Sequence, residues 1–105
     1  MIRLGTAFTV MLALLAPGHA ETNDAAKLRS AGEQVAFVVA CPKHFERLPP
    51  RTQRLAMDSG DRAASVFGKD AVREAALAAY GEGYYKQGER WCESMQSVLD
   101  YAGRF

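Results

Sequence analysis

Apolar residues recur three and four positions apart through most of residues 23–102, which is the spacing of amphipathic helices. We expect a first helix that Asn23 or Asp24 caps and that runs to about Cys41, since Pro42 stops regular helical hydrogen bonding. Its recurring apolar positions are Leu28, Ala31, Val35, Val38 and Val39. The stretch 35–41 is β-branched enough for a strand, but the chain offers no second strand to pair with it, so we favour a helix.

A second helix is expected after a connector over residues 42–49. Pro50 suits its first turn, where the missing N–H is not needed, and Gly68 closes it. Gly60 lies inside this helix and either kinks it or divides it into two short pieces. The positions expected to face the core are Leu55, Ala56, Ala63, Val66 and Phe67.

A third helix opens at Asp70 or in the preceding turn and carries a narrow, alanine-rich face that allows close approach of another helix. This face consists of Val72, Ala75, Ala76, Ala79 and Tyr80. Residues 80–88 contain three glycines, each of which costs about 1 kcal/mol in a helix interior relative to alanine, so this segment is either a weakened helix or a loop.

A last helix over residues 89–102 has the cleanest pattern, and Gly103 ends it. Its apolar side consists of Trp91, Cys92, Met95, Val98, Leu99 and Ala102.

The first 20 residues have the parts of a secretory signal peptide in the right order. Arg3 supplies the positive charge, residues 7–16 form the apolar stretch, and Gly18 and Ala20 are the small residues before the cut. The apolar stretch is shorter than the roughly 20 residues that a membrane-spanning helix needs, which disfavours an uncleaved anchor. We expect cleavage after Ala20, a periplasmic or secreted location, and no stable membrane anchor after cleavage.

Two cysteines, Cys41 and Cys92, remain after cleavage and predict one disulfide in an oxidising compartment. Closing a loop of about 50 residues stabilises a fold by roughly 4 kcal/mol in the chain-entropy model. The alternative is a redox or metal site, because His44 follows Cys41 by three positions. A redox pair needs a second cysteine there, and structural zinc needs four ligands, so we predict no metal and no cofactor.

Together these features predict an all-α fold: one domain over residues 21–105, built as a small antiparallel bundle of three to four helices. The disulfide would join its first and last helices.

The composition, 49% hydrophobic and 24% charged, is that of an ordinary globular protein. The net charge is +1 and falls to zero when the leader, which holds Arg3 and no acid, is removed. This neutrality argues against nucleic acid or an anionic membrane as a partner.

Four aromatic residues near two glycines form the candidate interaction surface, because aromatics with a polar tip are enriched at interfaces. They are Tyr80, Tyr84, Tyr85 and Trp91. The alternative is that these aromatics pack in the core, which is the commoner role of aromatics at helical spacing in a small bundle.

No catalytic motif is present in the sequence, so we expect a non-enzymatic protein that binds a protein partner or client, with homodimerisation open. In size, export signal, paired cysteines and helical content, the chain resembles small periplasmic proteins of the acid-stress chaperone type. That resemblance implies a dimer that loosens at low pH and exposes apolar faces to unfolding clients.

The alternative is a ligand-binding protein or enzyme whose site combines residues distant in sequence, including His44 and Tyr84. A deep pocket lined by His44 and at least two acids would favour this alternative.

Overall fold

The computed structural model of the chain describes residues 22–104. The expected signal peptide, with its cleavage after Ala20, lies outside these residues. Within the described range all regular structure is helical and no strand occurs, so the all-α prediction is confirmed and the stretch 35–41 is not a strand. The elements are α2 (Asn23–Ala40), α3 (Pro42–Glu46), α4 (Pro50–Phe67), α5 (Lys69–Ala79), the π-helical segment η1 (Tyr80–Tyr84), α6 (Tyr85–Gln87) and α7 (Glu89–Ala102).

These elements form five helices across the described residues when α5, η1 and α6 are counted as the one continuous rod that they make. The predicted number of three to four was too low, because the expected connector contains α3. The three glycines of the ambiguous segment do not open a loop. Helix continues through Gly81 and Gly83 as η1 and ends at Gly88, whose positive φ of 61° favours glycine.

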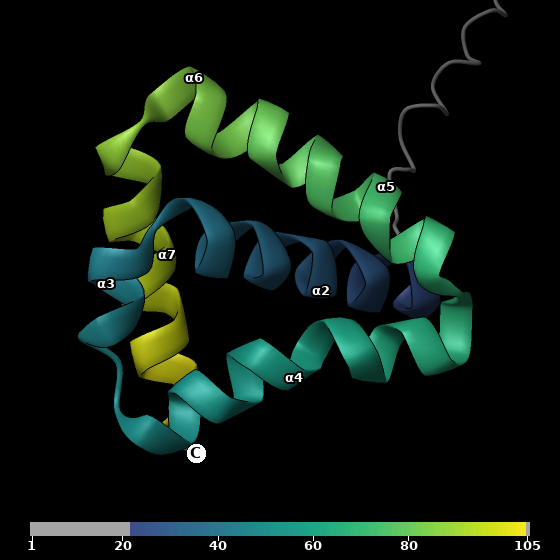
Figure 1. The fold of residues 1–105 in the computed structure, drawn as a ribbon, viewed down its shortest axis with the longest axis horizontal. Coiled ribbons are helices and arrows are strands. Elements are labelled where there is room, and N and C mark those ends of the chain that lie inside the picture. Colours follow the sequence, from purple (N-terminus) through teal and green to yellow (C-terminus); the bar gives the residue numbers. More distant parts are fainter. Residues whose placement is uncertain (1–21, 105) are drawn as a thin grey trace, which may run out of the picture.

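The bundle is also less regular than predicted. In Figure 1, α2 lies between α4 and α5, whereas α7 runs across the end of α2 beside α3. The disulfide therefore ties the C-terminal end of α2 to a crossing helix and not to a neighbour that runs alongside it.

Local chemistry explains where the helices begin and end. The N-cap of α2 is Thr22, one residue before the predicted Asn23, and its side-chain oxygen accepts a hydrogen bond from the Ala25 N–H at 3.0 Å. Pro50 starts α4 as predicted. Gly68 ends α4 with a φ of 93°, which favours glycine, and Gly60 does not divide this helix.

The core consists of two apolar clusters. The larger one surrounds the disulfide and contains Ala36, Phe37, Cys41, Leu48, Trp91, Cys92, Met95 and Leu99. The smaller one joins α2, α4 and α5 and centres on Ala31, Ala63 and Val72. Several positions expected to be buried are exposed instead: Val39, Leu55, Val66, Val98 and Ala102. The close helix approach expected from the alanine face is present, since a Cβ added to Gly32 of α2 would lie 2.5–2.6 Å from Ala75 of α5.

Candidate functional site

The two cysteines form the predicted disulfide and leave no thiol for chemistry in the described residues. The sulfur atoms of Cys41 and Cys92 are 2.05 Å apart, and both residues are buried. His44 is also buried, with 8% of its side chain exposed, and its Nε2 lies 3.3 Å from Oε1 of Glu89. The imidazole thus links α3 to the first turn of α7. It does not line either of the two hollows described below.

The four aromatic residues of the candidate interaction surface do not share one surface. Trp91 is buried, with its ring 6.5 Å from that of Phe37 in an edge-on arrangement. Tyr84 is half-buried against the same cluster, and Tyr85 is exposed. Tyr80 is the residue of this group that lines a groove, and its ring centroid lies 5.7 Å from that of Tyr84.

That groove is open and has a volume of about 550 Å³. Its floor comes from α2, and its two walls come from α4 on one side and from α5 with η1 on the other. In Figure 1 these helices are the three long rods. The lining residues are Val35, Ala36 and Val39 of α2, Met57, Gly60, Asp61 and Ala64 of α4, and Lys69, Val72, Arg73, Ala76, Leu77 and Tyr80 of α5 and η1. We call this hollow the apolar groove.

Polarity changes along the apolar groove. Its three charged residues, Asp61, Lys69 and Arg73, all lie within two helical turns of Gly68, where α4 meets α5. The far end is formed by large apolar side chains that are well exposed. Their exposed fractions are 75% for Val39, 60% for Met57, 62% for Leu77 and 41% for Tyr80. The gathering of these side chains in one groove makes it the leading candidate for a binding surface among the described residues.

The wall residues follow helical spacing, which is why they share one side of each helix. On α4 the lining residues are three, four and seven positions apart, and α5 continues the same pattern up to Tyr80. This spacing was visible in the sequence, where Val72, Ala76 and Tyr80 were assigned to one face. The sequence did not show that Tyr80, at the end of this face, is exposed.

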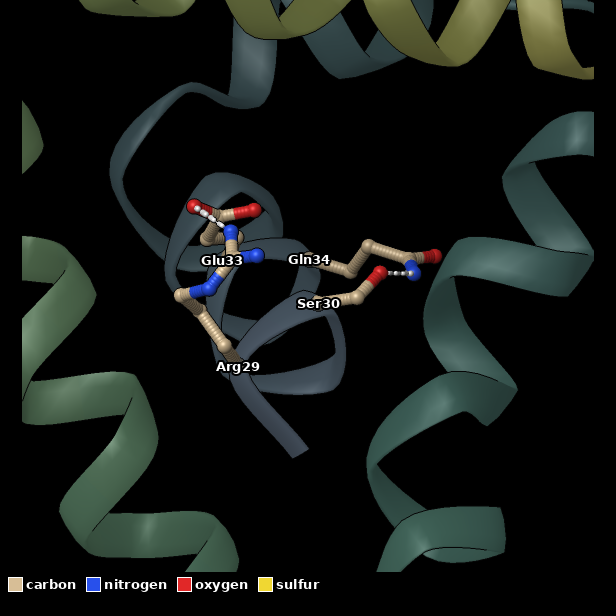
Figure 2. A network of polar contacts seen from close by, with 4 residues as sticks. All are labelled: Arg29, Ser30, Glu33 and Gln34. Atoms are coloured by element: carbon tan, nitrogen blue, oxygen red, sulfur yellow. Dashed lines mark hydrogen bonds and ion pairs between the residues drawn. The ribbon is translucent and has the colours of Figure 1, made fainter. Parts of the chain in front are cut away.

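A second hollow of about 490 Å³ lies between α2 and α4 and is more polar. Figure 2 shows that Ser30 and Gln34 point from α2 toward this side, where the Gln34 amide donates a hydrogen bond to the Ser30 hydroxyl at 3.3 Å. Beside them, Arg29 pairs with Glu33 at 3.6 Å. Such pairs four positions apart are ordinary contacts of a solvated helix face, so this hollow is the weaker candidate.

Other kinds of site find no support within the described chain. Of the helices in residues 22–104, none combines the length and the apolar character of a membrane-spanning segment. The same range contains no group of three or more His, Cys, Asp or Glu residues arranged to hold a metal ion. Comparison of the chain with protein-family models, with curated proteins and with solved structures finds no match.

Proposed function

We propose that the protein is a non-enzymatic binding protein that acts outside the cytoplasm and holds apolar segments of partner or client polypeptides in the apolar groove. The observation that carries this proposal is the gathering of Val39, Met57, Leu77 and Tyr80 at one end of the groove. Large apolar side chains in water are unfavourable by roughly 1.5–3 kcal/mol each relative to burial. A partner that covers them recovers part of that free energy.

The shape of the groove supports a polypeptide as the ligand. The groove is open to solvent and is lined by residues of α2, α4 and α5 with η1, which suits a chain segment that enters from solvent. Recognition of apolar segments in such grooves needs no reacting group, because affinity comes from the apolar area that is covered.

A small apolar ligand is the second candidate. Its support is the groove volume of about 550 Å³, which falls within the range of pockets that bind small molecules. An enzyme with His44 in its site has less support, because His44 is buried against Glu89 and lies outside both hollows.

Export is part of the proposal and has its own support. A buried disulfide that joins residues 51 apart is typical of proteins that fold in oxidising compartments. Mass spectrometry of the protein recovered from the periplasm tests this directly. We expect the mass of residues 21–105 with one intact disulfide. Recovery of the uncleaved chain from the cytosol with free thiols would contradict it.

A client-protection assay with matched valine variants tests the binding role. Val39→Ser removes an apolar side chain from the groove, whereas Val66→Ser removes one of nearly equal exposure, 72%, from outside it. Both valines are the penultimate residues of their helices. We expect the unaltered protein to keep an aggregation-prone client in solution, Val39→Ser to lose much of this protection, and Val66→Ser to retain it.

The same assay separates the alternatives. Equal loss of protection in both variants, or in neither, would contradict binding in the apolar groove. Protection that increases at acidic pH would support the acid-stress form of the proposal. Saturable turnover in a hydrolase screen without client protection would favour an enzyme instead.

A further inference from the structure

We infer that the segment held in the apolar groove is an amphipathic helix that places a carboxylate at the Gly68 end, within reach of Lys69 and Arg73. This inference rests on the proposed function and names its ligand more closely. Three features of the groove carry it: the helical form of its walls, the separation of its apolar and charged ends, and the unfavourable position of its two cations.

The walls indicate a helix as the ligand. Each wall presents side chains three and four positions apart, and rows of this kind form the ridges and grooves into which another helix packs. The wall from Lys69 to Tyr80 covers 11 residue steps, or about 16 Å at the helical rise. A helix of about three turns therefore spans the distance from the exposed apolar end to the charged end.

The charged residues at the Gly68 end of the groove indicate which charge the bound helix carries at that end. Of the lining residues at the Gly68 end, Lys69 and Arg73 are positive and Asp61 is negative, and Asp70, which pairs with Arg73 at 2.9 Å, adds a second negative charge beside them. Lys69 is the cation at this end that forms no ion pair within residues 22–104, so a carboxylate brought there by an amphipathic helix can pair with it. The apolar side chains of the same helix then lie over Met57, Leu77 and Val39.

The two cations are poorly placed for the stability of α5 itself. Lys69 is the first residue of the helix, where the partial positive charge of the N-terminus disfavours a cation, and Arg73 lies four positions after it. Arg73 pairs with Asp70 at 2.9 Å, but both side chains are well exposed and such pairs contribute little. Lys69 forms no ion pair within residues 22–104. A cation placed where it is unfavourable for its own helix is expected at a binding site that uses its charge.

Fluorescence anisotropy with a labelled amphipathic peptide tests the inference on the disulfide-intact protein, residues 21–105. One peptide of about four helical turns carries leucines at positions i, i+3, i+4 and i+7 and a glutamate at i+11. A second peptide has glutamine in place of that glutamate, and a third is a scrambled sequence of the same composition. We expect the glutamate peptide to bind about three- to tenfold more tightly than the glutamine peptide at low salt, with the ratio falling as salt is added.

A matched pair of double variants locates the effect. Lys69→Gln with Arg73→Gln removes both groove cations, and Lys43→Gln with Arg47→Gln removes an exposed lysine and arginine of the same spacing on and just after α3. We expect the first double variant to lose the preference for the glutamate peptide, since Asp61 and Asp70 then face no cation of this pair. The second should keep the preference of the unaltered protein.

The outcomes separate this inference from the proposed function. Equal binding of the glutamate and glutamine peptides, both weakened by Val39→Ser, would overturn the inference and leave the proposed function standing. If the scrambled peptide binds as tightly as the glutamate peptide, the inference that the ligand is a helix would be wrong. Absence of peptide binding together with absence of client protection would overturn both. Concentration-dependent self-association that Val39→Ser abolishes would overturn the inference as well, because a second copy of the chain would then occupy the groove.

Discussion

Gly83 leaves the space in which the indole of Trp91 packs in the core. A Cβ at this position would overlap the indole of Trp91, which packs directly over the glycine. Gly81, two residues earlier in η1, has open space where a Cβ would be. The two glycines therefore have different roles, although they are neighbours in the same turn.

We expect Gly83→Ala to lower the free energy of unfolding by about 1–3 kcal/mol, because the added methyl group forces Trp91 out of its position. Gly81→Ala is the matched control and should be neutral or stabilising by up to about 1 kcal/mol, since alanine is the better helix former. Urea denaturation followed by tryptophan fluorescence measures both. Equal effects of the two substitutions would contradict the packing of Trp91 against Gly83.

Helical periodicity identified most of the buried side of the last helix but overstated the core, in this helix as well as elsewhere, because Val98 and Ala102 are exposed. Trp91, Cys92, Met95 and Leu99 are buried as expected, and they surround the disulfide. Val39 and Val66 follow the same periodicity and are exposed. A period shows which residues share a face, and it contains no information on whether another helix covers that face.

At the scale of elements, the contact between α2 and α5 depends on small residues in both helices. Gly32 allows the backbone of α5 to approach at Ala75. Other residues of the same two helices line the floor and one wall of the apolar groove. The alanine-rich face of α5 was evident from the sequence. Its partner was not, because a glycine in the middle of a helix carries no hydrophobic signal.

Gly32→Ala should separate α2 from α5 and lower the free energy of unfolding by about 1–3 kcal/mol, because a Cβ there would meet the Ala75 backbone at 2.5 Å. Ser30→Ala, on the exposed side of the same helix, removes one hydrogen bond to Gln34 and should change stability by less than about 0.5 kcal/mol. Thermal denaturation followed by circular dichroism compares the two. A larger effect of Ser30→Ala would contradict this account of the helix contact.

For the molecule as a whole, the sequence was sufficient for the helical class, the disulfide and the ends of most helices. Pro50 and Gly68 marked helix ends because their backbone requirements are local. Gly103 follows the last helix as predicted, although its φ of −69° is open to any residue. The crossing of α7 over the end of α2 was not predictable in this way. It depends on how Phe37, Trp91 and the disulfide pack in three dimensions.

Replacing both cysteines, Cys41→Ser with Cys92→Ser, should lower the free energy of unfolding by about 4 kcal/mol, since the bond closes a loop between residues 51 apart. Chemical denaturation of this variant and of the unaltered protein, each with and without reductant, measures the loss. Reductant should destabilise only the unaltered protein. An unchanged midpoint in the variant would show that the bond contributes little to this fold.

A polypeptide segment that binds over the exposed apolar end of the groove changes the surroundings of the side chains there. Methyl-detected NMR of the disulfide-intact protein, titrated with the glutamate-bearing amphipathic peptide, tests this binding most directly. We expect shifts in the methyl signals of Val39, Met57 and Leu77, with those of Val66 and Val98 unchanged. Shifts confined to Val66 and Val98, or no shift at a saturating concentration of peptide, would contradict it.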